Sequence, residues 1–166
     1  MNLSQLPDNL PPPQDDGAAN HLQGKRLPNI TLATITGDNI SLAQLNGLTV
    51  LFAYPMTGRS DTPLPSGWDD IPGARGCTPQ SCAFRDLYSE FQQCKATLYG
   101  ISTQHSEEQA EAKNRLHLPY ELLSDEKLQL KNALALPTPP GGSDSSSSIF
   151  PPRLHEGNMQ YINNAL

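Results

Sequence analysis

The chain has few basic residues, few cysteines and no long hydrophobic run. Its 166 residues include 11 Lys and Arg against 17 Asp and Glu, giving a formal net charge of -6. Nucleic acids and anionic membranes attract basic patches, and the scattered Lys and Arg therefore argue against both as main partners. An acidic balance is also simply what keeps many small domains soluble.

No segment approaches the roughly 18 consecutive apolar residues that a membrane-spanning helix needs. Residues 1–20 contain neither an apolar run nor a cationic start, so no secretory signal is expected. Three cysteines form an odd number, which does not suggest a secreted scaffold held together by disulfides. We expect a soluble, cytoplasmic protein in a reducing compartment, where cysteines are more often chemical or incidental than structural.

A chain of this length is expected to form one domain of ordinary size. Residues 1–24 carry a proline run and few large apolar side chains, and predict a disordered N-terminal arm. Residues 139–148 have the Ser- and Gly-rich composition of a linker, and residues 149–166 form a C-terminal remnant. The folded domain is predicted over residues 25–138.

Short apolar runs alternate with amphipathic segments through this domain. A hairpin is predicted around the turn at residues 36–39. Buried strands are predicted at three apolar runs, 48–54, 97–102 and 120–123. Helices are predicted at three periodic segments, 78–91, 106–118 and 125–136. Alternating strands and helices predict an α/β layered domain.

Cys77 lies where a long loop, residues 56–76, enters the helix predicted from Thr78. Unpaired backbone N–H groups at a helix start favour a negative charge, and Arg75 adds a nearby cation. Both influences lower the pKa of a thiol and favour the nucleophilic thiolate. The alternative is that Cys77 is a small hydrophobic residue at a helix start. Trp68 either packs this loop over Cys77 or serves as a simple anchor.

Cys82 follows Cys77 by five residues. In an ideal helix their Cα atoms would lie about 8.6 Å apart, whereas a disulfide rarely tolerates more than about 7 Å. The pair could therefore bridge only if the first turn unwound. A metal site is the rival interpretation, but this spacing suits zinc poorly and no second pair of ligands accompanies it, so no metal is expected. Cys94, three residues after Phe91, is predicted to be a buried core thiol.

Five short segments make the sequence resemble the peroxiredoxin family: Tyr54-Pro55, Gly76 to Cys82, Phe84-Arg85-Asp86 and, at the family's usual spacing, Gly100 to Thr103 and Leu122 to Asp125. The closest branch is that of bacterioferritin-comigratory and Q-type peroxiredoxins. The resemblance covers roughly residues 27–138 and implies a thioredoxin-like three-layer fold. It implies that Cys77 is the peroxidatic cysteine and Cys82 the resolving cysteine. It further implies no cofactor, a hydroperoxide substrate and a thioredoxin-like reductant.

The sequence departs from the family pattern at two places before the cysteine. Asp70 and Ala74 stand where the family has a proline and a hydroxyl residue. Pro55 and Thr57, on the far side of an insertion, could supply the ring and the hydroxyl instead. Thr78 and Arg75 are further candidate supporting residues.

A second departure follows the last predicted helix. The resemblance implies two further strands there, one of which carries an arginine, and a serine-rich linker stands in their place. We therefore expect a sheet that is incomplete at its C-terminal end. Arg59, Arg75 and Arg153 are possible substitutes for the arginine, or ordinary surface residues.

Two classes of function remain. The first is an antioxidant thiol peroxidase that acts through Cys77 and Cys82. The second is a truncated, weakly active or inactive thioredoxin-fold module for redox sensing or interaction. The retained cysteines favour the first class, and the missing strand with its arginine favours the second.

Overall fold

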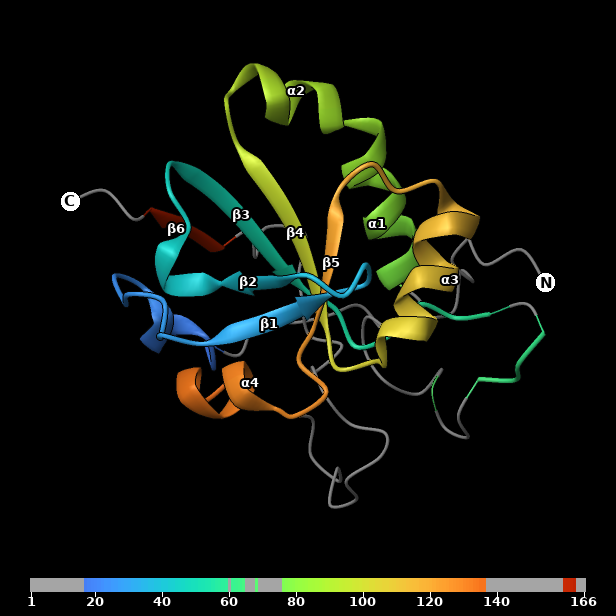
Figure 1. The fold of residues 1–166 in the computed structure, drawn as a ribbon, viewed down its shortest axis with the longest axis horizontal. Helices are drawn as coiled ribbons and strands as arrows, with labels where there is room; N and C mark the ends of the chain where they lie inside the picture. Colours follow the sequence, from blue (N-terminus) through green and yellow to red (C-terminus); the bar gives the residue numbers. More distant parts are fainter. Residues whose placement is uncertain (1–16, 60, 65–67, 69–75, 137–159, 164–166) are drawn as a thin grey trace.

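The structure is a computed structural model that describes residues 17–59, 61–64, 68 and 76–136, together with the backbone of residues 160–163 (Figure 1). The elements in chain order are η1 (Asn20–Leu22), β1 (Thr31–Thr34), β2 (Asn39–Ser41), η2 (Leu42–Gln44), β3 (Leu48–Ala53), α1 (Cys77–Asp86), α2 (Tyr88–Gln93), β4 (Thr97–Ser102), α3 (Ser106–Leu116), β5 (Glu121–Ser124), α4 (Gln129–Leu134) and β6 (Gln160–Asn163). None of the described helices is long and apolar enough to cross a bilayer.

The strands form one mixed sheet in the order β2-β1-β5-β4-β3-β6. The central strands β3, β4 and β5 run parallel, with Phe52 opposite Gly100 and Gly100 opposite Leu122. The hairpin β1–β2 joins β5 in antiparallel pairing, and β6 joins β3 in the same way. The predicted hairpin and the three predicted buried strands are confirmed.

Side chains that alternate along the central strands build two cores, one on each face of the sheet. Phe52 and Leu122 belong to the core that α1 and α3 cover, whereas Leu51 and Leu123 belong to the core that α4 covers. Figure 1 shows α1 and α3 together on one side and α4 beside β1. The three-layer, thioredoxin-like α/β fold expected from the resemblance is confirmed.

The prediction of a single helix over residues 78–91 is wrong. The helix divides at Leu87 into α1 and α2, because Leu87 has φ -93° and ψ 5°. Leu87 is consequently 44% exposed, although the helical periodicity placed it on the apolar face. The same break corrects the prediction for Cys94, which lies at the end of α2 and is exposed instead of buried.

The N-terminal flank of the predicted domain contributes contacts to the fold. Residues 17–24, which the sequence assigned to the arm, are described: Leu22 packs in the core under α4, and His21 Nε2 hydrogen-bonds with the Leu134 carbonyl at 2.8 Å. The last helix is shorter than predicted: α4 spans Gln129–Leu134 and its N-cap is Leu128. Asp125 nevertheless supports its start, as predicted, because the carboxylate accepts hydrogen bonds from the N–H groups of Leu130 and Lys131. Residues 1–16 and the predicted linker lie outside the described residues.

The C-terminal end of the sheet carries one described strand, β6, after α4. Its pairing with β3 places Ile162 opposite Thr49. The expectation of an incomplete sheet at this end agrees with the structure. The remaining domain boundaries stay predictions.

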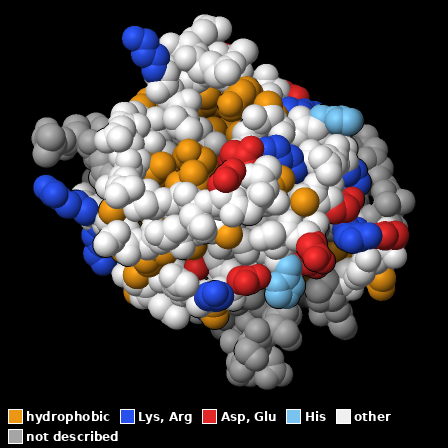
Figure 2. Space-filling model, viewed as in Figure 1, with side chains coloured by type: hydrophobic (Ala, Val, Ile, Leu, Met, Phe, Trp, Pro, Cys, Tyr) orange, Lys and Arg blue, Asp and Glu red, His pale blue; other side chains and the backbone are white. Residues whose placement is uncertain are grey.

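The surface shown in Figure 2 carries basic and acidic side chains interspersed with one another. Hydrophobic side chains gather in small groups between them. The scattered Lys and Arg of the sequence predict such a mixture of charges on the face shown.

Gly100 sits in β4, where the two neighbouring strands leave no room for a side chain. A Cβ atom there would lie 2.7 Å from Leu122 Cδ2 and 2.9 Å from Phe52 Cζ. Both neighbours are buried in the core beneath α1, so neither can move freely. The glycine therefore allows Phe52 and Leu122 to approach each other across the middle strand.

We expect Gly100→Ala to lower the free energy of unfolding by about 1–3 kcal/mol, because an added methyl group overpacks the core. Urea denaturation followed by circular dichroism measures the change. Thr97→Ala, at an exposed position of the same strand, is the matched control and should change stability by less than about 0.5 kcal/mol. Equal effects of the two substitutions would contradict the packing argument.

Candidate active site

Cys77 is the first residue of α1, and Gly76 is its N-cap. The helix thus begins one residue before the predicted range of 78–91, and Thr78 is buried in its first turn. Cys77 is only 7% exposed and belongs to the same buried cluster as Tyr54 and Phe84. The sulfur therefore sits at the head of a helix, as predicted, but inside the protein.

Burial raises the pKa of the Cys77 thiol to about 11, because a thiolate is poorly solvated in an apolar cluster. Hydrogen bonds from the backbone of Met56 and of Cys77 itself act in the opposite direction. The expectation that this setting lowers the pKa is thus wrong for the described surroundings. Arg75, the cation expected to assist, lies outside the described residues.

The segment from Tyr54 to Gly58, which follows β3, forms the other wall of the site. It is held against the carboxyl end of β4 by three hydrogen bonds. The Tyr54 N–H donates to the Ile101 carbonyl at 3.0 Å, and the Ser102 hydroxyl donates to the Pro55 carbonyl at 3.0 Å. The Thr57 N–H donates to Gln104 Oε1 at 3.0 Å. The position of the Met56 backbone, which contacts Cys77, therefore depends on residues of β4 and the loop after it.

Thr57 combines deep burial with an unused hydroxyl. The residue is 2% exposed, and its Oγ1 has no hydrogen-bond partner in the described part of the chain. A buried hydroxyl without a partner costs stability, and it is free to bond to a polar ligand that enters the site. Thr57 adjoins Met56, whose backbone reaches Cys77. Thr57 is thus one residue away in sequence from the backbone group that hydrogen-bonds with Cys77.

Two glutamines of this site were missed by the sequence analysis. The Gln109 side chain is fully buried; its amide donates to the carbonyls of Ser102 and Gln104, and its Oε1 accepts from the Tyr54 hydroxyl at 3.4 Å. A signal for Gln104 existed, because polar residues at the carboxyl ends of adjacent parallel strands meet at one edge. Gln109 lies inside the polar first half of a helix, where nothing in the sequence distinguishes it.

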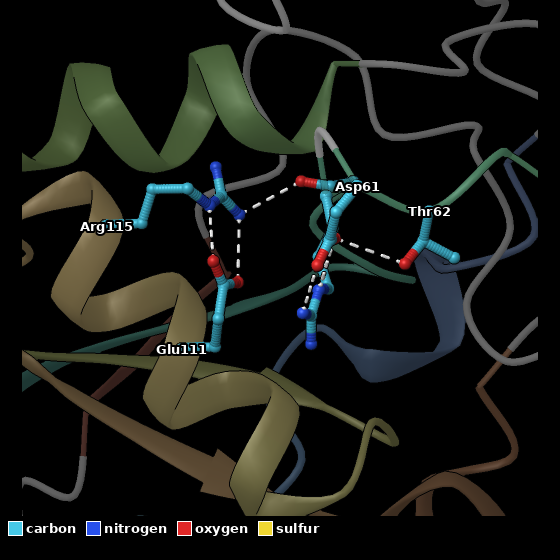
Figure 3. Close-up of polar contacts among 6 residues, drawn as sticks. Asp61, Thr62, Glu111 and Arg115 are labelled. Carbon is cyan, nitrogen blue, oxygen red and sulfur yellow. Dashed lines mark hydrogen bonds and ion pairs between the residues drawn. The ribbon is translucent and has the colours of Figure 1, made fainter.

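Two arginines of the neighbourhood are engaged in ion pairs (Figure 3). Arg115 of α3 pairs with Glu111 one turn away and donates through Nη2 to the Gly58 carbonyl at 3.0 Å. Arg59, a predicted substitute for the family arginine, is exposed and binds both carboxylate oxygens of Asp61, at 2.8 and 2.6 Å. Neither is among the groups that shift the pKa of Cys77. Arg153 lies outside the described residues.

Cys82 lies on the same uninterrupted helix as Cys77 and is partly buried against the same cluster. All three cysteines are free thiols. Because α1 continues to Asp86, the helical separation of about 8.6 Å between the Cα atoms of the pair holds in this conformation. The two sulfurs share one element and need a local rearrangement to meet.

Comparison with known proteins identifies relatives over most of the chain. A family model described as the AhpC/TSA family matches residues 71–153, half of the sequence. The chain is 33% identical over 141 residues to peroxiredoxin Q, chloroplastic, of Gentiana triflora, covering 81% of this chain and 58% of that protein. It is 34% identical over 134 residues to peroxiredoxin bcp1 of Schizosaccharomyces pombe, covering 79% and 61%. The chain spans little more than half the length of these curated relatives.

Solved structures agree on the fold. Peroxidoxin BcpB from Mycobacterium tuberculosis superposes with a TM-score of 0.54 at 30% identity, covering 70% of this chain and 66% of that one. A peroxiredoxin Q structure from Xanthomonas campestris gives 0.55 at 21% identity, covering 74% and 72%.

We expect the three cysteines to react with a bulky maleimide in the order of their exposure: Cys94 first, Cys82 next and Cys77 last. Labelling a buried thiol requires local opening, and an opening that costs about 1.4 kcal/mol slows labelling about tenfold. Mass spectrometry of peptides from a time course measures the three rates, and labelling in denaturant provides the control. Native labelling of Cys77 as fast as Cys94 would contradict the buried position of its sulfur.

Proposed function

This chain belongs to the AhpC/TSA family, in the peroxiredoxin Q/bcp branch, and from that premise we propose that it is a thiol-dependent peroxidase whose nucleophile is Cys77. The observation that carries the proposal is the Cys77 sulfur at the head of α1, with backbone hydrogen bonds directed to it and an unpaired thiol on Cys82 in the same helix. Hydrogen peroxide or an organic hydroperoxide is the substrate.

The reaction balances without a metal or organic cofactor. The Cys77 thiolate attacks one peroxide oxygen, the O–O bond breaks, and the other oxygen leaves as water or an alcohol after taking up a proton. Cys77 is then a sulfenic acid. The Cys82 thiol attacks that sulfur, an S–S bond forms, and the hydroxyl leaves as water. A dithiol reductant of the thioredoxin type returns both cysteines to thiols.

Polar groups near Cys77 suit the binding of a peroxide. The free Thr57 hydroxyl can donate a hydrogen bond to a peroxide oxygen, and the N–H groups at the start of α1 can stabilise the developing negative charge. Pro55 keeps this wall in place through its carbonyl. Thr78, buried in the first turn, contributes packing at the base of the site.

A weakly active or inactive thioredoxin-fold module for redox sensing or interaction is the second candidate, and the buried Cys77 with its raised pKa favours weak activity. A thiol with a pKa of about 11 is almost entirely protonated at neutral pH and reacts slowly. The rate of Cys77 oxidation separates the two candidates. A cytoplasmic location remains a proposal from composition.

We expect one equivalent of hydrogen peroxide to produce an intramolecular disulfide between Cys77 and Cys82. Cys82→Ser should stop at sulfenic acid on Cys77, because no second thiol is in reach, and Cys77→Ser should form no disulfide. Mass spectrometry of quenched samples identifies each product. The reaction of Cys77 should be about 100-fold or more faster than that of a free thiol.

Cys94→Ser is the matched control, since Cys94 is exposed and lies outside α1. It should leave the product and the rate unchanged. A disulfide that includes Cys94 would reject Cys82 as the resolving cysteine. Oxidation of Cys77 no faster than that of a free thiol would reject the peroxidase in favour of the weakly active or inactive module.

Arg75 is proposed as the cation that offsets the burial of Cys77. A positive charge within about 4–6 Å lowers the pKa of a thiol by about 1–3 units. The pKa of Cys77 should therefore be about 1–3 units lower in the wild type than in the Arg75→Ala variant. A lower pKa means more thiolate at neutral pH, so the variant should react about tenfold or more slowly at pH 7. Thiolate absorbance against pH, in a Cys82→Ser, Cys94→Ser background, measures the shift.

Arg75→Lys keeps the charge and is expected to retain most of the lowered pKa. Titration of Cys77 near 11 in both the parent and Arg75→Ala would show that Arg75 does not act on the sulfur.

A further inference from the structure

Tyr120 connects the segment after α3 to the middle of α1. Its hydroxyl donates a hydrogen bond to the Ser81 carbonyl at 2.8 Å. That carbonyl belongs to the peptide unit that joins Ser81 to Cys82. The bond therefore fixes the backbone immediately before the thiol that is proposed to resolve Cys77.

The Tyr120 side chain is itself held in place. The residue is 2% exposed, and its ring packs edge-on against Phe52 with centroids 5.7 Å apart. Tyr88 approaches it from α2, with centroids 6.2 Å apart. Burial raises the pKa of the Tyr120 phenol above its ordinary value, so the hydroxyl stays protonated and remains a donor at neutral pH.

A second contact lies one turn further along α1. Arg85 Nη1 donates to the Leu116 carbonyl at the end of α3, at 2.9 Å, and Arg85 Nε pairs with Asp86. The two contacts stand on either side of Cys82 and attach this part of α1 to the α3–β5 connection. The first turn differs, because Gly76 supplies no side-chain cap there.

Joining Cys77 to Cys82 requires α1 to unwind, since the intact helix holds their Cα atoms about 8.6 Å apart. We propose that the Ser81–Cys82 peptide turns in that movement and leaves the Tyr120 hydroxyl, so that Tyr120 is a positioning residue for Cys82. Its hydrogen bond stabilises the helical dithiol form and is absent from the disulfide form. This inference deepens the proposed function, because the same two cysteines carry both.

The proposal has consequences for equilibrium and for rate. A hydrogen bond present in only one form biases the dithiol–disulfide equilibrium by about 0.5–1.5 kcal/mol, on the order of fivefold. Loss of the bond favours the disulfide. Resolution of the sulfenic acid then becomes faster, and less Cys77 survives long enough to be oxidised to sulfinic acid by excess peroxide.

The experiment compares Tyr120→Phe with the parent, both carrying Cys94→Ser, in a series of reduced and oxidised dithiothreitol buffers. This measurement needs no peroxidase activity, so it stands even if Cys77 fails to react with peroxide. We expect the midpoint potential of the Cys77–Cys82 pair to become more negative by about 20 mV, the equivalent of a fivefold change in the equilibrium constant. After one equivalent of peroxide, the disulfide should form about fivefold faster.

Tyr88→Phe is the matched control. It removes a phenol hydroxyl from the ring beside Tyr120, and that hydroxyl makes no hydrogen bond among the described residues. The control should leave the potential and the rate unchanged. Urea unfolding should show that Tyr120→Phe destabilises the reduced protein more than the oxidised protein. An unchanged potential, equal shifts for both variants, or equal destabilisation of both redox forms would overturn the role of Tyr120.

Discussion

Burial of the Cys77 sulfur at the start of α1 is the constraint on which the rest of the site depends. Removing a thiol from water favours its neutral form, while the backbone groups around it favour the anion. The same burial hinders the approach of large reagents to the thiol. The reactivity of the Cys77 thiol, its accessibility to reagents and its ability to form a disulfide therefore all depend on how far the first turn of α1 can open.

The segment after β3 and the later part of α1 are held by hydrogen bonds, whereas the start of α1 has fewer such bonds. The segment after β3 is fastened to the end of β4 through Ser102, Gln104 and Gln109, so the wall that faces the sulfur is fixed. The later part of α1 is fastened to the α3–β5 connection through Tyr120 and Arg85. The helix start has no such side-chain support. A movement that joins the two cysteines can thus be confined to a few residues of α1, with Cys77 leaving its place in the buried cluster.

The sequence was sufficient where one local signal decides the structure. The apolar runs at β3 and β4, the turn of the hairpin and the carboxylate of Asp125 each specify their element without help from elsewhere. The prediction was wrong where packing decides the structure. The helical periodicity of the sequence continues through Leu87, but the helix is interrupted there and Cys94 is exposed. The head-of-helix position of Cys77 was predictable, whereas its burial was not, because Tyr54 and Phe84 are brought to it by tertiary structure. Gln109 was missed for the same reason.

The pairing of β6 with β3 joins parts of the chain that are far apart in sequence. Thr49 faces Ile162, roughly 110 residues away, and closing so long a loop carries a large entropic cost before any contact forms. The parallel centre of the sheet and its two cores can assemble from residues up to α4, so β6 is suited to dock last. Until it does, β3 presents an open row of backbone donors and acceptors to neighbouring molecules. Once paired, β6 covers that edge of β3 and removes it as a site for pairing with other molecules.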